Sequence, residues 1–139
     1  MDVNAIANYI ATKAGGISGI RGASGQSVDT IPAAPYVVVG AVHQGSIIPG
    51  SWERTRMDFP VRLFIARTAD AARTDSTVNS FVNAFIAEFR TQGTESGAVA
   101  STVITYFSTD YEETVGGEDY DGIEFTVEVV VNSAVGYTP

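Results

Sequence analysis

Alternating apolar and polar positions mark two half-buried strands. Every second residue from Met57 to Ile65 is apolar, and the same is true from Ile123 to Val131. This is the period at which the side chains of a β-strand point to one face. We therefore expect each segment to be a strand with one face in the core. Pro60 lacks a backbone N–H, which favours an edge or a bulge at that point.

Apolar positions at helical spacing predict two amphipathic helices. Asp2 can cap the first, and Gly15–Gly16 can end it. Asp70 and Gly93 are the corresponding residues of the second. The apolar stripes consist of Val3, Ile6, Ala7, Ile10 and Ala14 in the first helix, and of Ala71, Val78, Phe81, Val82, Phe85, Ile86 and Phe89 in the second. Such stripes face a core, so we expect the three phenylalanines to pack against a sheet.

The remaining segments complete an α+β domain. A weak strand and a loop are expected over 17–34, a strand over Tyr36–Val42, a loop over His43–Ser51 and a strand over Ala100–Ser108. The element order is then α-β-β-β-α-β-β, with hairpins joining the second strand to the third and the fourth to the fifth. It predicts a two-layer sandwich over residues 1–139, with two helices on one face of a mostly antiparallel sheet of four to five strands.

The charge of the chain is acidic and unevenly distributed. The net charge is −8, and there is no cysteine, so thiolate metal sites and cysteine nucleophiles are excluded. All eight basic residues lie at or before Arg90, whereas nine of the sixteen acids lie between Glu95 and Glu128. The net charge argues against binding DNA through its phosphates, and the asymmetry suits subunits that pack head to tail. We expect neither a signal peptide over 1–12 nor a membrane span.

Three patterns that could indicate a reaction or a metal ion are weak. The single histidine, His43, has Ser46 and Ser51 nearby, but neither serine lies in a G-x-S-x-G motif. A calcium-loop alignment through Asp119, Asp121, Gly122 and Glu128 puts Gly117 at the first position, where a carboxylate is required. The adjacent Glu112 and Glu113 could act as a glycosidase pair, but acids are common in this region. We expect no catalytic, cofactor-binding or metal-binding site.

The segment 45–56 has the composition of a binding surface. Ile47 and Ile48 are apolar within an expected loop, and Trp52 is followed by Arg54 and Arg56. An aromatic residue beside arginines could stack on bases. The same residues are enriched at the centres of protein interfaces, and the acidic net charge favours this second interpretation. We therefore predict that these five residues contact another protein.

Three segments together resemble the tail terminator proteins of long, non-contractile phage tails, especially those of phages that infect actinobacteria. They are the proline-led strand Pro35–Gly40, the strand Phe59–Arg67 with the helix that follows, and Tyr111–Glu112 with the hairpin Gly116–Val129. The resemblance extends over nearly the whole chain in element order. The loop Gly45–Ser51 and the acidic hairpin 110–121 depart from the family.

The resemblance implies a structural virion protein without cofactor or reaction, assembled in the host cytoplasm. It would form a hexameric ring, cap the tail tube protein and join the tail to a head-completion or connector protein, while DNA passes through unbound. The acids Glu112, Glu113, Glu118, Asp119 and Asp121 would then line the lumen, solubilise the hairpin or pair with Arg54, Arg56 or Arg62 of the next subunit. A head-completion protein, a tube subunit, and a small hydrolase or carbohydrate-binding module remain alternatives.

Overall fold

The computed structural model describes residues 2–48, 54–67, 71–91 and 99–132. Within these residues the chain forms two helices, α1 (Val3–Gly15) and α2 (Ala71–Glu88), and seven strands: β1 (Gly22–Ser24), β2 (Tyr36–Val39), β3 (Gln44–Ile48), β4 (Arg54–Ala66), β5 (Arg90–Thr91), β6 (Val99–Val115) and β7 (Glu118–Val131). Asp70 and Gly93, the expected ends of the second helix, lie outside the described residues. Neither helix is long and apolar enough to cross a membrane.

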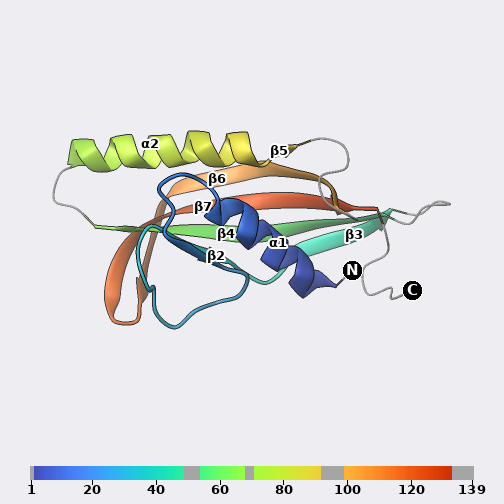
Figure 1. The fold of residues 1–139 in the computed structure, drawn as a ribbon, viewed down its shortest axis with the longest axis horizontal. Coiled ribbons are helices and arrows are strands. Elements are labelled where there is room, and N and C mark those ends of the chain that lie inside the picture. Colours follow the sequence, from blue (N-terminus) through green and yellow to red (C-terminus); the bar gives the residue numbers. More distant parts are fainter. Residues whose placement is uncertain (1, 49–53, 68–70, 92–98, 133–139) are drawn as a thin grey trace.

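The strands form one sheet in the order β1-β2-β4-β7-β6-β5, with β3 beside β4 on the same side as β2 (Figure 1). All neighbours are antiparallel except β1 and β2. The α+β two-layer sandwich and the predicted hairpin of β6 and β7 are confirmed. The other predicted hairpin is confirmed only as the antiparallel pairing of β2 with β4, because β3 lies between them in the chain. The sheet is wider than the predicted four to five strands because β3 and the two-residue β5 also join it. Neither has an apolar alternation that could be recognised in the sequence.

Both helices cover the same face of the sheet. In Figure 1 α1 lies across the front of the sheet and α2 runs beside β6. Their apolar side chains share one core with the odd-numbered residues of β4 (57–65) and β7 (123–131). We call this side the helix face and the opposite side the outer face. Phe81, Phe85 and Phe89 are buried there as predicted, and the Phe85 ring stacks on Phe125 at 4.4 Å between centroids.

Asp2 and the glycines end α1 as the sequence indicated. The Asp2 carboxylate accepts a hydrogen bond of 2.7 Å from the backbone N–H of Ala5. At the other end, the helix stops at Gly15, and the Gly16 N–H donates to the Lys13 carbonyl. Capping satisfies backbone groups that a helix end leaves unpaired. The first helix is therefore determined by local sequence signals together with its buried stripe.

Pro60 does not lie on an edge strand, because β4 runs through the middle of the sheet. It lies where the neighbour of β4 changes from β2, which ends at Val39, to β3, which begins at Gln44. The Pro60 carbonyl accepts a hydrogen bond of 2.8 Å from Gly40 on that side. In an antiparallel strand the N–H of a residue points the same way as its carbonyl. The missing N–H therefore faces the break between two strands, where no ladder bond is lost.

The prediction of a loop over His43–Ser51 was wrong for its first half. Residues Gln44–Ile48 form β3, which pairs with β4 from Asp58 to Arg54. Glycine, serine and a nearby proline obscure the strand in the sequence. The pairing with β4 supplies the hydrogen bonds that make these residues a strand. The predicted strand Tyr36–Val42 correspondingly stops at Val39.

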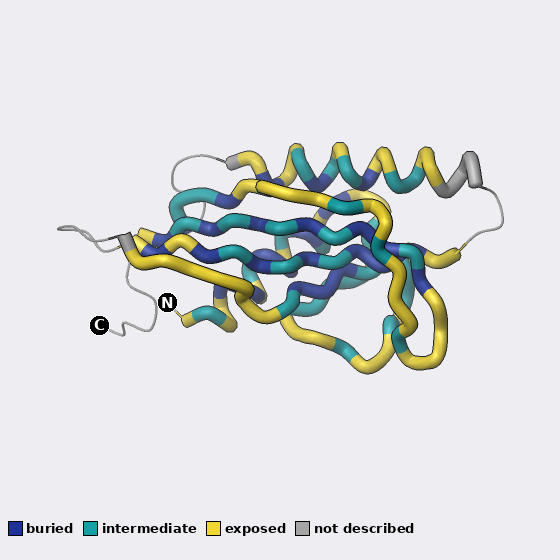
Figure 2. The backbone as a smooth tube through the Cα atoms, turned by 180° about the vertical axis from the view of Figure 1, so that it is seen from behind, coloured by how far each residue is buried: buried dark blue, intermediate teal, exposed yellow. Residues whose placement is uncertain are grey.

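The acidic hairpin consists of the long strands β6 and β7 joined at Gly116–Gly117. Both glycines have positive φ (61° and 84°), as a type I′ turn requires. Near this hairpin, a small second core on the outer face consists of Val38, Phe64 and Tyr120. Val28 and Ile31 pack against this core and partly cover it. Figure 2, which views the outer face, shows no helix over it.

Candidate functional site

Four of the five predicted interface residues, Ile47, Ile48, Arg54 and Arg56, lie on β3 and β4 at one end of the sheet. The Ile47 side chain is 64% exposed, which is unusual for so large an apolar residue. Arg54 and Arg56 are exposed on β4. Ile48 belongs to β3, but its side chain lies outside the described residues, as does all of Trp52. Ile47 is therefore the predicted apolar contact whose exposure the structure confirms.

Three of the five predicted acids surround a single base, Arg67. The guanidinium contacts Asp121 at 3.1 Å, Glu112 at 3.3 Å and Asp119 at 3.9 Å. The hydrogen bond to Asp121 raises the pKa of the Arg67 side chain. Sequence reasoning missed Arg67, because it lies 45 residues or more before these acids and meets them only when β4 pairs with β7. Salt bridges at so exposed a site contribute little stability.

The other two acids, Glu113 and Glu118, accept hydrogen bonds from tyrosine hydroxyls. Tyr111 donates to Glu113, and Tyr120 donates to Glu118 at 3.0 Å. Burial, followed by the hydrogen bond to Glu113, raises the pKa of Tyr111 to about 12. The phenol therefore remains a neutral donor at physiological pH. The five acids occupy one end of the sheet, where Arg67 offsets only part of their charge.

Two of the three arginines proposed as partners for the acids of a neighbouring subunit, Arg56 and Arg62, have partners within the chain. Arg62 contacts Glu124 at 3.0 Å and Arg56 contacts Glu128 at 3.5 Å across the β4–β7 ladder. These two ion pairs lie on the outer face. Because Arg56 remains about half exposed, it can still contact a second partner.

The residues of the glutamate pair and of the calcium-loop alignment do not come together in space. Glu112 pairs with Asp121 and Glu113 with Tyr120 on β7, so the two carboxylates point to opposite faces of the sheet. Asp119 and Glu128 are nine residues apart on β7, a distance of about 30 Å in an extended strand. No cluster of His, Asp or Glu suited to a metal ion occurs in the described part of the chain. The calcium-loop alignment and the glutamate pair are therefore contradicted as single sites.

One surface was not predicted from the sequence. Val103, Tyr106 and Phe107 are exposed on β6, the last two at 59% and 45%. A groove of about 320 Å³ lies between Ile86 of α2 and residues 104–107 of β6. The run Val103–Phe107 contains apolar residues without strict alternation, a pattern that could have indicated apolar side chains on both faces.

The sequence matches no known protein-family model, and no curated protein matches it significantly. Function must therefore be argued from this chain's own residues.

Proposed function

We propose that this chain is a structural subunit of a tailed-phage particle, a tail terminator that forms a ring at the head-proximal end of the tail. The ring caps the tail tube, offers the tail to a head-completion or connector protein, and lets DNA pass. The proposal assigns the chain no reaction and no cofactor.

The proposal rests on the position in the sheet of the three segments that resemble tail terminator proteins. Pro35–Gly40 contains β2, Phe59–Arg67 covers most of β4, and Gly116–Val129 covers most of β7. These three strands are consecutive neighbours in the sheet. Segments that are dispersed along the chain therefore build one contiguous unit, which supports a shared architecture with tail terminators over a chance match of short motifs.

The charge distribution supports passage of DNA without binding. The acids of the β6–β7 hairpin outnumber the two bases beside them, Arg62 and Arg67. Glu112 and Asp119 remain 69% and 60% exposed. Carboxylates that face a lumen repel phosphates over a Debye length of about 8 Å at physiological salt. We place this hairpin, with Glu113 and Glu118, on the lumen wall of the ring.

The first experiment measures assembly. Light scattering and negative-stain imaging of the purified protein, alone and with tail tubes, should reveal six-membered rings that bind one end of a tube. Rings that bind only the head would instead support a head-completion protein, and incorporation along the tube would support a tube subunit. A protein that remains monomeric and binds no tube would refute the proposal.

The second experiment tests the lumen. Glu113→Lys with Glu118→Lys should slow DNA ejection from particles that still assemble. The triple variant Ser80→Lys, Ala87→Lys and Glu88→Lys, at exposed positions of α2, changes the net charge by the same amount and serves as the control. Normal ejection from the double variant would contradict the lumen placement. Failed assembly of the double variant alone would assign these acids to subunit pairing instead.

A further inference from the structure

The exposed large apolar side chains gather on two opposite edges of the sheet. Among the described residues they are Val42, Ile47, Val103, Tyr106 and Phe107. The first two lie on or just before β3, and the other three lie on β6. A monomeric soluble protein rarely places its exposed apolar residues in this way, whereas an interface does.

Both edges also have unpaired backbone. Within the described residues β3 pairs only with β4, and residues 41–47 are all exposed. At the opposite side, β5 covers β6 only at Thr102 and Val103, so from Ile104 onward the β6 edge has no partner strand in the part of the chain that the structure describes. Exposed edges of this kind readily accept another strand, and natural proteins usually protect them.

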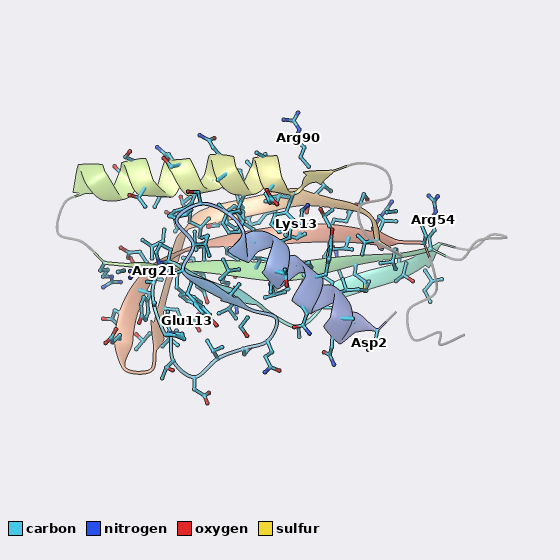
Figure 3. All side chains as sticks on the ribbon, in the orientation of Figure 1. Asp2, Lys13, Arg21, Arg54, Arg90 and Glu113 are labelled. Atoms are coloured by element: carbon cyan, nitrogen blue, oxygen red, sulfur yellow. The ribbon has the colours of Figure 1, made fainter. Side chains whose placement is uncertain are left out.

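The two edges are complementary in shape and charge. Ile47 points to the helix face, because it pairs with Thr55 on β4. The groove between Ile86 and β6 opens beside Phe107, whose pairing with Phe125 places it on the same face. Figure 3 shows Arg54 and Glu113 at opposite ends of the sheet, so a basic hairpin and an acidic strand are available on one molecule.

We propose that β3 of one copy pairs with the free edge of β6 of the next copy, with Ile47 in the groove between α2 and β6. The inference rests on the proposed ring and specifies its subunit contact. The two surfaces differ, so the contact is head to tail and can close into a ring. A second copy is the occupant that the structure favours, because one chain presents both complementary edges.

The topology determines the direction of this pairing. Strand β3 is antiparallel to β4, which is antiparallel to β7, which is antiparallel to β6. Copies that keep their strand direction around a ring therefore bring β3 antiparallel to β6. With Ile47 opposite Phe107, Ser46 lies opposite Ser108 and Gln44 opposite Asp110. This register staggers neighbouring sheets by about six residues, roughly 20 Å, and a closed sheet requires such a stagger.

Disulfide trapping tests the contact directly, because the natural chain has no cysteine. The Ile47→Cys variant is mixed with the Phe107→Cys variant, and the mixture is oxidised. In parallel mixtures, Thr105→Cys or Thr109→Cys replaces Phe107→Cys to allow for a shift in register. Directly opposed residues have Cα separations that a disulfide can span. We expect cross-linked dimers in a mixture and none from either variant alone. Dimers from a single variant would indicate a two-fold contact and overturn the proposal, as would no dimers in any mixture.

A charge placed on the edge tests whether the contact drives assembly. Ile47→Lys should weaken self-association at least about tenfold, because the ammonium would be buried in an apolar groove. Ser80→Lys, at an exposed position of α2 on the side away from Ile86, adds the same charge and should leave association unchanged. Rings that persist with Ile47→Lys would refute this contact and leave the proposed function standing. If the variant still self-associates normally but no longer binds the tail tube protein, the edge belongs to that partner and the inference fails.

The cross-linking experiment could also yield chains joined through Ile47→Cys and Phe107→Cys that neither close into rings nor bind tails. They would support the edge contact and refute the terminator function. The failure of each proposal is therefore distinguishable from the failure of the other.

Discussion

Replacing Phe85 by alanine should be among the most destabilising single changes in this domain. The side chain is fully buried and lies between α2 and the sheet. Its ring is almost parallel to that of Phe125, with an interplanar angle of 6°, and contacts Phe89 at 6.2 Å between centroids. Truncation to alanine would remove buried apolar surface and the stacked aromatic pair, and it would leave a cavity between α2 and the sheet.

The expected cost follows from these contacts. Phe→Ala in a core costs about 3–5 kcal/mol, which includes the cavity left behind. Loss of a stacked pair contributes about 0.5–1.5 kcal/mol beyond buried area, so we expect a value in the upper part of that range. A chain of this length has a free energy of unfolding of about 7–20 kcal/mol. The variant should therefore fold, with a large part of its stability lost.

Urea unfolding followed by circular dichroism measures this cost. With a slope of about 2 kcal/mol per M, the midpoint should fall by about 1.5–2.5 M. Phe107→Ala is the matched control, because the same atoms are removed from a ring that is 45% exposed. It should cost under about 1 kcal/mol in the monomer. Equal shifts for the two variants, or an unchanged midpoint for Phe85→Ala, would refute the assignment of Phe85 to the core.

Three further changes test local features. Asp2→Ala removes the cap of α1 and should lower the free energy of unfolding by about 0.5–2 kcal/mol, a loss that thermal melting would detect. Gly116→Ala forces a side chain into positive φ and toward Thr30; we expect a cost of about 1–2 kcal/mol, seen as faster amide hydrogen exchange in the hairpin. The raised pKa of Tyr111, about 12 against its ordinary 10, stabilises the fold fully below pH 10 and progressively less up to pH 12, because the unfolded phenol ionises first. Tyr111→Phe should therefore lose less stability than the natural protein between pH 10 and 12, and parallel pH profiles would contradict this.

Sequence periodicity predicted the elements that carry their own signal. The alternation from Met57 to Ile65 and the stripe through Phe85 were correctly assigned because an element with one buried face has apolar residues at a regular spacing. The cap at Asp2 and the turn at Gly116 are equally local, since each depends on a few neighbouring backbone groups.

The candidate site was predicted less completely. The exposure of Ile47 was anticipated, but β3 was taken for a loop because an edge strand receives its hydrogen bonds from β4 and has no apolar alternation of its own. The convergence of acids on Arg67 was not anticipated, and neither was the apolar edge at Tyr106 and Phe107.

By itself, the sequence determined the class of the domain and its helix-facing core. It could do so because periodicity, capping and composition are properties of contiguous residues. The tertiary structure decided which strands become edges, which acids share Arg67, and where a groove opens beside β6. These depend on strand order and register, which bring together residues such as Arg67 and Asp121 that lie far apart in the chain.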